Sequence, residues 1–356
     1  MKEYRLKNLI SNMERHGLEH MLISSPASIF YLTGKWIETG ERLLALYINN
    51  SGKNRLLINE LFPIDTNLGV DLEVYNDNQD PITILAGTID NKKLGIDKNW
   101  PSNFLIRLME RKQGMSFING SPIIDEIRMI KDEEEINLMK EASRVNDNAM
   151  SDIVNIINAD IDEKKVGKLL SEIYEKYNTE SFSFQPLIAY GANCAEPHHA
   201  SNLTKPKDGN SIIIDIGGKT KMYCSDMTRT VFYKRINEEQ KKVYDLVLSA
   251  NLKAIATVKP NARFSDIDLA ARAVIEDGGY GEYFTHRSGH NIGIEVHEFP
   301  DVSSTNNMIV RKGMIFSIEP GIYLPNNFGV RIEDLVVVTD TGCDVLNTYT
   351  KRIQVI

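Results

Sequence analysis

Two aspartates stand in neighbouring strand-type stretches near the middle of this 356-residue sequence. Asp215 ends an apolar, β-branched run that begins at residue 211, and Asp226 lies in a second run that follows a polar turn at residues 219–221. Two such runs around a short turn are typical of a β-hairpin. A buried carboxylate needs a partner, and one cation satisfies two converging carboxylates. Taken alone, this pattern favours a plainer interpretation, in which Asp215 caps a turn and Asp226 pairs with Arg229.

A second pair of acids follows the same pattern near the C-terminus. Glu319 ends a strand-type run at residues 314–319, and Glu333 lies in a returning run at residues 328–338. Between the two pairs, residues 286–298 form a glycine-punctuated segment that holds three of the seven histidines of the chain. This repetition shifts the balance toward one shared site built from both pairs.

The elements that must position these residues repeat as well. Residues 131–233 and 237–339 each predict, in order, two amphipathic helices, a histidine loop and a hairpin with two acids. Three polar residues are predicted to cap the helices: Asp162, Asn237 and Ser265. We interpret the order as an internal duplication with pseudo-twofold symmetry, in which two hairpins face each other with helices behind them. Such symmetry brings the four carboxylates together at the centre.

Residues 1–125 predict a separate, smaller α/β domain ahead of a second domain at residues 126–356. Alternating helix-type and strand-type stretches fill the first domain, and residues 124–132 are predicted to be a linker. The first domain contains no glycine-rich nucleotide-binding motif. Its expected role is structural: it packs, forms a dimer contact or shapes a site housed elsewhere.

Composition excludes several classes of function. The net charge of −8 argues against nucleic acid or an anionic membrane surface as the main partner. Three scattered cysteines are too few for a disulfide framework or a zinc–thiolate site. The first residues show no apolar signal region, and no apolar run reaches membrane-spanning length, so we expect a cytoplasmic protein.

Four acids in one pocket would repel one another strongly. Two divalent cations would balance the four negative charges. Carboxylates can also bridge a metal pair about 3.5–4 Å apart, so four acids can hold two ions. His290 is the natural fifth ligand, and four carboxylates with one imidazole suit manganese, cobalt(II), iron(II) or zinc. A metal pair of this kind activates water at neutral pH and polarises a carbonyl group, which is hydrolytic chemistry. His198 and His297 remain as hydrogen-bond donors or proton shuttles for the same reaction.

The motifs around these residues resemble the pita-bread metallopeptidases, in the proline-specific branch of Xaa-Pro aminopeptidase and Xaa-Pro dipeptidase (prolidase). The resemblance rests on Asp215 and on five stretches: Ser225-Asp226-Met-Thr-Arg-Thr, Gly289-His290, Glu295-Val-His297-Glu298, Ser317-Ile-Glu319-Pro-Gly and Gly329-Val-Arg331-Ile-Glu333-Asp334. It covers the whole chain, because the first domain resembles the N-terminal domain of creatinase and prolidase. The implied fold class is α+β, with a pita-bread domain preceded by a smaller α/β domain.

The resemblance also assigns roles by position. The metal ligands of the family fall on Asp215, Asp226, His290, Glu319 and Glu333. Its general base falls on Glu319, and Arg331 matches an arginine that supports the site. The histidine that faces the scissile amide nitrogen falls on His198, and the histidine near the substrate carbonyl falls on His297. The cofactors implied are two divalent ions per subunit, with manganese preferred over cobalt, zinc or iron.

Two positions depart from the family pattern. Asn291 replaces the glycine that usually follows the ligand histidine; because asparagine tolerates a left-handed backbone, we expect this replacement to do little damage. Some prolidases carry an arginine suited to the free carboxylate of a dipeptide where this chain has Asp301. That replacement weakens the interpretation as a strict dipeptidase.

The resemblance implies hydrolysis of the peptide bond between an unsubstituted N-terminal residue and a following proline. The alternatives are a metal-free, creatinase-like hydrolase and a non-catalytic binding protein on the same fold; relatives of both kinds lack the acid set. A homodimer is implied by the resemblance alone. We further hypothesise that Trp36 to Glu41 closes the active site of the neighbouring subunit, and the alternative is a surface aromatic and a solvated acid.

Overall fold

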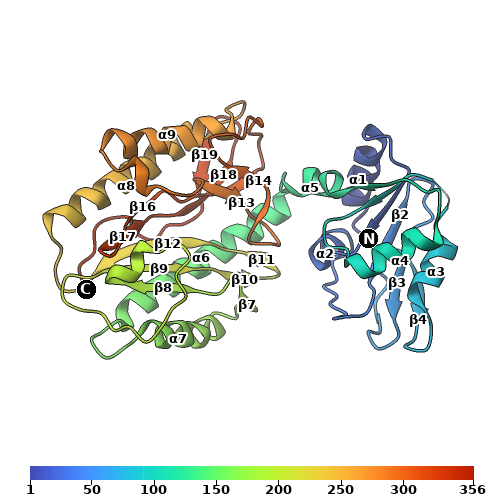
Figure 1. Ribbon diagram of the computed structural model, residues 1–356, viewed down its shortest axis with the longest axis horizontal. Coiled ribbons are helices and arrows are strands. Elements are labelled where there is room, and N and C mark those ends of the chain that lie inside the picture. Colours follow the sequence, from blue (N-terminus) through green and yellow to red (C-terminus); the bar gives the residue numbers. More distant parts are fainter. Residues whose placement is uncertain (91) are drawn as a thin grey trace. The chain divides into compact units, whose positions relative to one another are not determined.

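The computed structural model describes residues 1–90 and 92–356, which form two compact units, Met1–Arg128 and Met129–Ile356 (Figure 1). Helix α5 (Ser121–Arg128) ends the first unit. The linker predicted at residues 124–132 is therefore wrong over its first half, where Ile124 is buried and Ile127 is half-buried at helical spacing. None of the helices in the described ranges combines the length and the apolar content needed to cross a membrane.

The first unit is built on a six-stranded mixed sheet with the order β4-β3-β2-β1-β5-β6. Its strands are β1 (His20–Ile23), β2 (Ala45–Asn49), β3 (Arg55–Asn59), β4 (Asp71–Tyr75), β5 (Leu94–Ile96) and β6 (Phe117–Asn119). Its other helices are α1 (Glu3–Arg15), α2 (Pro26–Thr33), α3 (Pro81–Thr88) and α4 (Ser102–Arg111). Apolar residues of α3 and α4 pack with those of β1, β2 and β5 in one buried cluster, which stabilises an α/β layer structure.

The second unit carries four long helices and the remaining strands. The helices are α6 (Glu133–Ile156), α7 (Glu163–Lys176), α8 (Glu238–Thr257) and α9 (Phe264–Asp277), with short 3-10 helices η1 (Gly191–Ala195) and η2 (Gly281–Tyr283). The strands of the first half are β7 (Ser181–Phe182), β8 (Leu187–Tyr190), β9 (Ser211–Ile216), β10 (Gly218–Thr220), β11 (Tyr223–Cys224) and β12 (Met227–Phe232). Those of the second half are β13 (Gly289–Asn291), β14 (Glu298–Val302), β15 (Ile315–Ile318), β16 (Gly321–Leu324), β17 (Phe328–Arg331), β18 (Asp334–Val338) and β19 (Cys343–Val345).

The two acidic hairpins predicted from the sequence are confirmed. Strand β9 pairs antiparallel with β12, and β15 pairs antiparallel with β18. Beyond each pair, the intervening chain forms a second antiparallel pair, β10 with β11 in the first half and β16 with β17 in the second. Both halves thus share the order helix, helix, histidine loop and four strands.

Helices cover the strands on two sides. Helices α6 and α7 contact β8 to β11, and α8 and α9 contact β14 to β17, and Figure 1 shows α7 and α9 on opposite sides of the strands. Each half has its own apolar core, which includes Leu170 and Ile214 in the first half and Ile267 and Phe316 in the second. Full burial of such a side chain contributes about 1.5–3 kcal/mol, so the two cores hold the acidic strands firmly in place.

Polar caps fix where the helices begin. The Asp162 carboxylate accepts from the backbone N–H of Lys165 at 2.9 Å, and Asn237 forms a capping box with Gln240, as the sequence predicted. The predicted cap at Ser265 is wrong. Helix α9 begins at Phe264 because the Asp266 carboxylate accepts from the backbone N–H of residue 263 at 3.0 Å, which leaves Ser265 buried inside the first turn.

Candidate metal and active site

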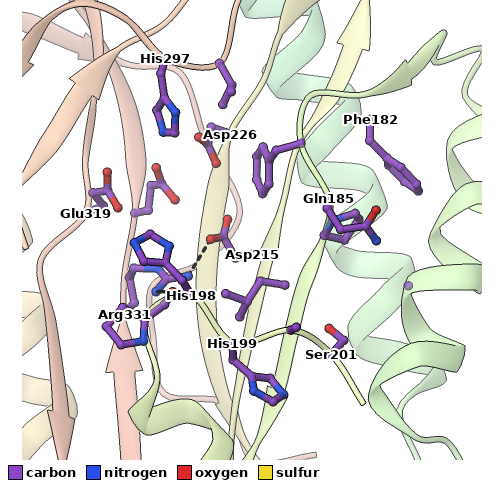
Figure 2. Close-up of a pocket in the computed structure, with 18 of the residues that line it drawn as sticks. Phe182, Gln185, His198, His199, Ser201, Asp215, Asp226, His297, Glu319 and Arg331 are labelled. Carbon is purple, nitrogen blue, oxygen red and sulfur yellow. Dashed lines mark hydrogen bonds and ion pairs between the residues drawn. The ribbon is translucent and has the colours of Figure 1, made fainter. Parts of the chain in front are cut away.

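The structure brings the predicted site residues to the wall of one cavity of about 1170 Å³ in the second unit (Figure 2). Strand ends supply the acids: Asp215 lies in β9, Asp226 precedes β12, Glu319 follows β15 and Glu333 precedes β18. The cavity wall also includes His198, His290, His297 and Arg331. Residues more than a hundred positions apart therefore converge through the pairing of the two hairpins.

The donor set fits a divalent cation. One ligand atom from each of Asp226, His290 and Glu333 lies within 4.8 Å of the other two, and all three residues are buried. The His290 Nε2 atom lies 3.6 Å from Asp226 Oδ2 and 3.5 Å from Glu319 Oε1, which is too far for a hydrogen bond. Among the described side chains, the Oδ1 atoms of Asp215 and Asp226 are buried without a hydrogen-bond partner. A shared cation would satisfy these oxygens.

The ring of His290 is oriented for ligation. Its Nδ1 lies 3.2 Å from the carbonyl oxygen of Asn291, and only a protonated Nδ1 can bond to a carbonyl. The lone pair of Nε2 is then directed at the acids. Burial, aided by His297, lowers the pKa of His290 to about 3, so the ring is neutral at pH 7.

Asn291 does not adopt a left-handed backbone, so the physical reason for expecting asparagine to be tolerated there does not apply. Asn291 lies in strand β13 and is not among the residues with positive φ. Its side chain is fully buried, and its Nδ2 donates to the carbonyl oxygen of Pro300 at 2.9 Å. Asparagine at this position therefore ties β13 to β14, and its tolerance of unusual backbone angles plays no part.

Electrostatics concentrate negative charge at the site. Burial is the largest cause that raises the pKa of Asp226 and of Glu333 well above their usual values, and the neighbouring carboxylates add to it. Burial, with a contribution from Asp215, also raises the pKa of Glu319 to about 7. Positive charge at the centre would let all of them ionise at neutral pH.

Arg331 links two acids of the site. Its Nη2 donates to Asp215 Oδ2 at 2.6 Å, and its Nε donates to Thr228 Oγ1 at 3.1 Å. Thr228 Oγ1 in turn donates to Glu333 Oε2 at 2.8 Å. One buried guanidinium therefore orients one carboxylate directly and a second through a hydroxyl group.

Arg229 holds the strand that follows Glu333. Its Nη2 donates to Asp334 at 2.8 Å, and its Nη1 donates to the carbonyl oxygen of Glu333 at 2.5 Å. The plainer interpretation, in which Arg229 pairs with Asp226, is therefore wrong, because this guanidinium pairs with Asp334 and donates to carbonyl oxygens of the C-terminal segment.

Two further histidines flank the acids. The rings of His290 and His297 meet edge to face, with their centroids 4.2 Å apart. Burial, followed by the charge of Arg287, lowers the pKa of His297. His198 is exposed to the cavity, and Figure 2 shows its ring beside Arg331 and the carboxylates.

Sequence reasoning missed part of the polar network. Tyr323 accepts from Arg331 Nη1 at 3.0 Å, and its hydroxyl lies 2.7 Å from His286 Nε2. Burial and Arg331 lower the pKa of His286 to about 4, so its neutral ring donates from Nδ1 to the carbonyl of Arg287 and accepts a hydrogen bond from the Tyr323 hydroxyl at Nε2. A signal existed for Thr228, because it stands two residues after Asp226 in a strand-type run; the structure pairs it directly opposite Asp215. No pattern in the sequence indicated the role of Tyr323.

Comparison with known proteins agrees with this arrangement. A family model described as metallopeptidase family M24 matches residues 137–340, and one described as the creatinase/prolidase N-terminal domain matches residues 5–130. A putative dipeptidase of Bacillus subtilis (strain 168), YkvY, is 33% identical over 361 residues, which covers 99% of both chains.

Solved structures extend the likeness to the fold. A prolidase from Thermococcus sibiricus matches with a TM-score of 0.95 and 32% identity, over 100% of this chain and 99% of the other. An Xaa-Pro dipeptidase from Bacillus anthracis matches with a TM-score of 0.91 and 28% identity, over 99% of both chains. The predicted fold class and the resemblance to the pita-bread peptidases are confirmed. This chain is a peptidase that belongs to metallopeptidase family M24, with the N-terminal domain of creatinase and prolidase ahead of its peptidase domain.

Proposed function

We propose that this protein hydrolyses the peptide bond between an N-terminal residue and a following proline, with Xaa-Pro dipeptides as its main substrates. The observation that carries the proposal is the pair of buried, unpartnered oxygens of Asp215 and Asp226 within a cluster of four acids and a neutral imidazole. The names of the similar proteins, a prolidase and an Xaa-Pro dipeptidase, support proline at the second position and a dipeptide length.

Two divalent ions per subunit are part of the proposal. Asp215, Asp226, His290, Glu319 and Glu333 would hold them. When bound, such ions supply an activated water molecule and a Lewis acid for the scissile carbonyl. Oxygen-rich ligation with one imidazole favours manganese, with cobalt, zinc and iron as alternatives.

The side chains of this protein then divide the remaining work. Glu319, whose Oε1 accepts from Ser317 Oγ at 3.3 Å, takes the proton of the attacking water. His297 donates a hydrogen bond to the substrate carbonyl oxygen, where negative charge develops. His198 protonates the proline nitrogen as it leaves. Arg331 keeps Asp215 and Glu333 oriented throughout.

The two alternative functions do not require a complete set of four acids. A metal-free, creatinase-like hydrolase or a binding protein has no need of four carboxylates, which repel one another unless cations are present. The complete acid set therefore favours the metallopeptidase. An Xaa-Pro aminopeptidase that prefers longer peptides uses the same chemistry and differs from a dipeptidase in how the substrate carboxylate is bound.

The assembly and the compartment are also proposals. We propose a cytoplasmic homodimer in which Trp36 to Glu41 closes the active site of the neighbouring subunit. Trp36 Nε1 donates to Glu38 Oε1 at 2.9 Å. This hydrogen bond fixes the two side chains relative to each other, and in the proposed dimer both would contact the neighbouring active site. Light scattering on the purified protein tests the dimer, and unchanged kinetics for Trp36→Ala and Glu38→Ala would remove the loop from the proposal.

Hydrolysis of Ala-Pro beside Ala-Pro-Ala tests the main proposal. The manganese-loaded protein should cleave Ala-Pro faster, and both a chelated sample and Asp226→Asn should be inactive. Preferential cleavage of the tripeptide would make the protein an Xaa-Pro aminopeptidase. Cleavage of neither peptide by a protein with bound metal would refute proline specificity.

A further inference from the structure

Two buried acids lie on corresponding helices of the duplicated halves of the peptidase unit. Glu163 lies on α7 and Asp268 on α9, the second helix of each half, and both are fully buried. The same separation of 105 residues relates Glu163 to Asp268 and Asn146 to Asn251, which occupy the first helix of each half. Neither acid lines the cavity. Both acids therefore lie outside the cavity wall, and each can act on the site only through the loop that it holds.

Glu163 holds the loop that carries His198. Its two carboxylate oxygens accept four hydrogen bonds of 2.8 Å, all from this one loop: Tyr190 N, Asn193 Nδ2, His199 Nε2 and Asn202 N. Four donors complete the acceptor capacity of a carboxylate, and they come from both ends of the loop. Glu163 therefore ties both ends of the loop at residues 190–202 to one point on α7.

The position of His198 depends on the hydrogen bonds that hold this loop to Glu163. His199, its neighbour, is buried and bonded to Glu163, and Figure 2 shows the two rings pointing in different directions, with that of His198 toward the carboxylates. On the cavity side, Arg331 Nη1 donates to the carbonyl oxygen of Pro197 at 3.3 Å. The backbone before and after His198 is thus held from opposite sides, by Arg331 in front and Glu163 behind.

Asp268 holds the loop that leads to His290. Its Oδ1 accepts from both the backbone N–H of Ser288 at 3.0 Å and the Ser288 hydroxyl at 2.8 Å. The carbonyl oxygen of Ser288 then accepts from the backbone N–H of Glu319 at 2.8 Å. Asp268 therefore holds Ser288, which lies two residues before His290 and is hydrogen-bonded to Glu319, and both of these residues are predicted metal ligands.

Arg272 extends the hold of Asp268 along the same loop. Its guanidinium pairs with the Asp268 carboxylate at 3.0 Å and donates to the carbonyl oxygens of Phe284 and His286, each at 3.0 Å. A loop of five residues is thereby bonded to α9 at three points.

We infer that Glu163 and Asp268 are positioning residues, and that they affect different parts of the site. Glu163 sets the place of His198, a proton donor that binds no metal, whereas Asp268 sets the place of His290 and Glu319, which hold metal. The inference rests on the proposed function for its kinetic part, and metal binding provides a measurement that is independent of turnover.

Isosteric amides test each carboxylate. Glu163→Gln places an amide donor against buried N–H groups, so kcat for Ala-Pro should fall roughly 10- to 100-fold while the affinity for manganese stays within about twofold of the unmodified protein. Asp268→Asn should weaken manganese binding roughly 10- to 100-fold, measured by calorimetry or by the visible spectrum of the cobalt form. Glu163→Asp, which keeps the charge, should recover most of kcat. If Glu163→Gln does not fold, Asn193→Ala, which removes one of the four donors to Glu163, should lower kcat while manganese affinity stays within about twofold.

Asp97→Asn is the matched control. Asp97 is a buried carboxylate in the first unit that accepts from the backbone N–H groups of Ser24 and Ser25, so its variant loses stability for the same reason. It should keep both kcat and metal affinity. The inference is overturned if folded Glu163→Gln and Asp268→Asn match the unmodified protein, or if both lose activity only in step with their unfolded fraction. An unmodified protein that binds manganese but cleaves no Xaa-Pro peptide would instead contradict the proposed function, and the metal affinity of Asp268→Asn would still decide the inference for that loop.

Discussion

Asn146 and Asn251 make the same hydrogen bond in the two halves of the peptidase unit. Each is the fourteenth residue of its helix, α6 or α8, and each is fully buried. Asn146 Nδ2 donates to the carbonyl oxygen of Ile216 at 2.8 Å, and Asn251 Nδ2 donates to that of Ile318 at 3.0 Å. These carbonyls end β9 and β15, the strands whose ends carry Asp215 and Glu319. The duplication has therefore kept the support of the acidic strands along with the acids.

Removal of either asparagine should destabilise the protein. Asn146→Ala or Asn251→Ala leaves a buried carbonyl unsatisfied, so the free energy of unfolding of the second unit should fall by about 1–3 kcal/mol in urea titrations. Asn158→Ala is the control, because Asn158 is exposed and its side chain bonds to nearby backbone, the carbonyl of Ile156 and the N–H of Asp160. Equal stability of all three variants would show that the shared hydrogen bond is not a structural requirement.

Much of this architecture was readable from the sequence, for a definite reason. A carboxylate at the end of a β-branched run, such as Asp215 or Glu319, conflicts with the burial of its strand, and that conflict occurs twice at matching places. Helical periodicity located the helices because their apolar faces pack against the strands. The hairpins, the repeat and the fold class were therefore predictable.

The polar supports behind the site were not predictable. Glu163 begins a helix, where an acid is favourable on any exposed surface, and only the return of the 190–202 loop makes it a buried acceptor. Asn291 was judged by its backbone tolerance, although its side chain bonds across β13 and β14. Alignment of the two halves at their 105-residue separation would have exposed the pairs Asn146 with Asn251 and Glu163 with Asp268.

Loss of one acid should have opposite effects on the metal-free and metal-loaded protein. Asp226→Asn or Glu333→Gln should lower kcat by at least about 100-fold, because the metal loses a ligand. The same change removes one of several buried like charges, so the metal-free variant should melt at a higher temperature than the metal-free unmodified protein. Added manganese should raise the melting temperature of the unmodified protein only. Asp344→Asn, at an exposed acid, should change none of these values.

The metal-free protein should lose stability as the pH rises from about 6.5 to 8; below that range the buried histidines, whose pKa is lowered, make an opposite contribution that offsets the decline. Burial raises the pKa of Glu319 from 4.5 to about 7 in the folded protein, and the pKa of Asp226 and of Glu333 is raised as well. Protonation therefore favours the folded state, and this contribution is complete below the unfolded pKa and lost as the pH passes through the folded one. Melting curves in chelator at successive pH values should show the decline, and Glu319→Gln should reduce it. A melting temperature that rises over this range would contradict the prediction.

The two flanking histidines should affect turnover and leave metal content unchanged. His198→Ala and His297→Ala each remove a proton donor, so kcat for Ala-Pro should fall roughly 10²- to 10⁴-fold. Metal analysis of the purified variants should give the same ion content as the unmodified protein. His16→Ala, in the first unit, is the control and should keep full activity. A loss of metal in His198→Ala would make this residue a ligand and would refute its assignment as a donor.

Arg287 and Asp301 should have opposite effects on dipeptide binding. Arg287 lines the cavity, and its Nη1 lies 3.8 Å from Asp301 Oδ2, with both side chains about 40% exposed. An exposed pair at this distance is weak, so a substrate carboxylate can replace Asp301 as the partner of Arg287. The free carboxylate of a dipeptide can thus be bound although Asp301 occupies the place of the arginine found in some prolidases.

The measurement is the KM for Ala-Pro against that for its C-terminal amide. Arg287→Ala should raise the KM for Ala-Pro about 10-fold, because a charged hydrogen bond of roughly 1.5–3 kcal/mol is lost, and should leave the amide unaffected. Asp301→Asn should lower the KM for Ala-Pro, because it frees Arg287 from its competitor. Arg235→Ala, at an exposed arginine outside the cavity, controls for the loss of positive charge. Equal changes for the acid and the amide would exclude Arg287 as the carboxylate partner and would leave the cavity lysines, Lys164 and Lys168, as the cations to test next.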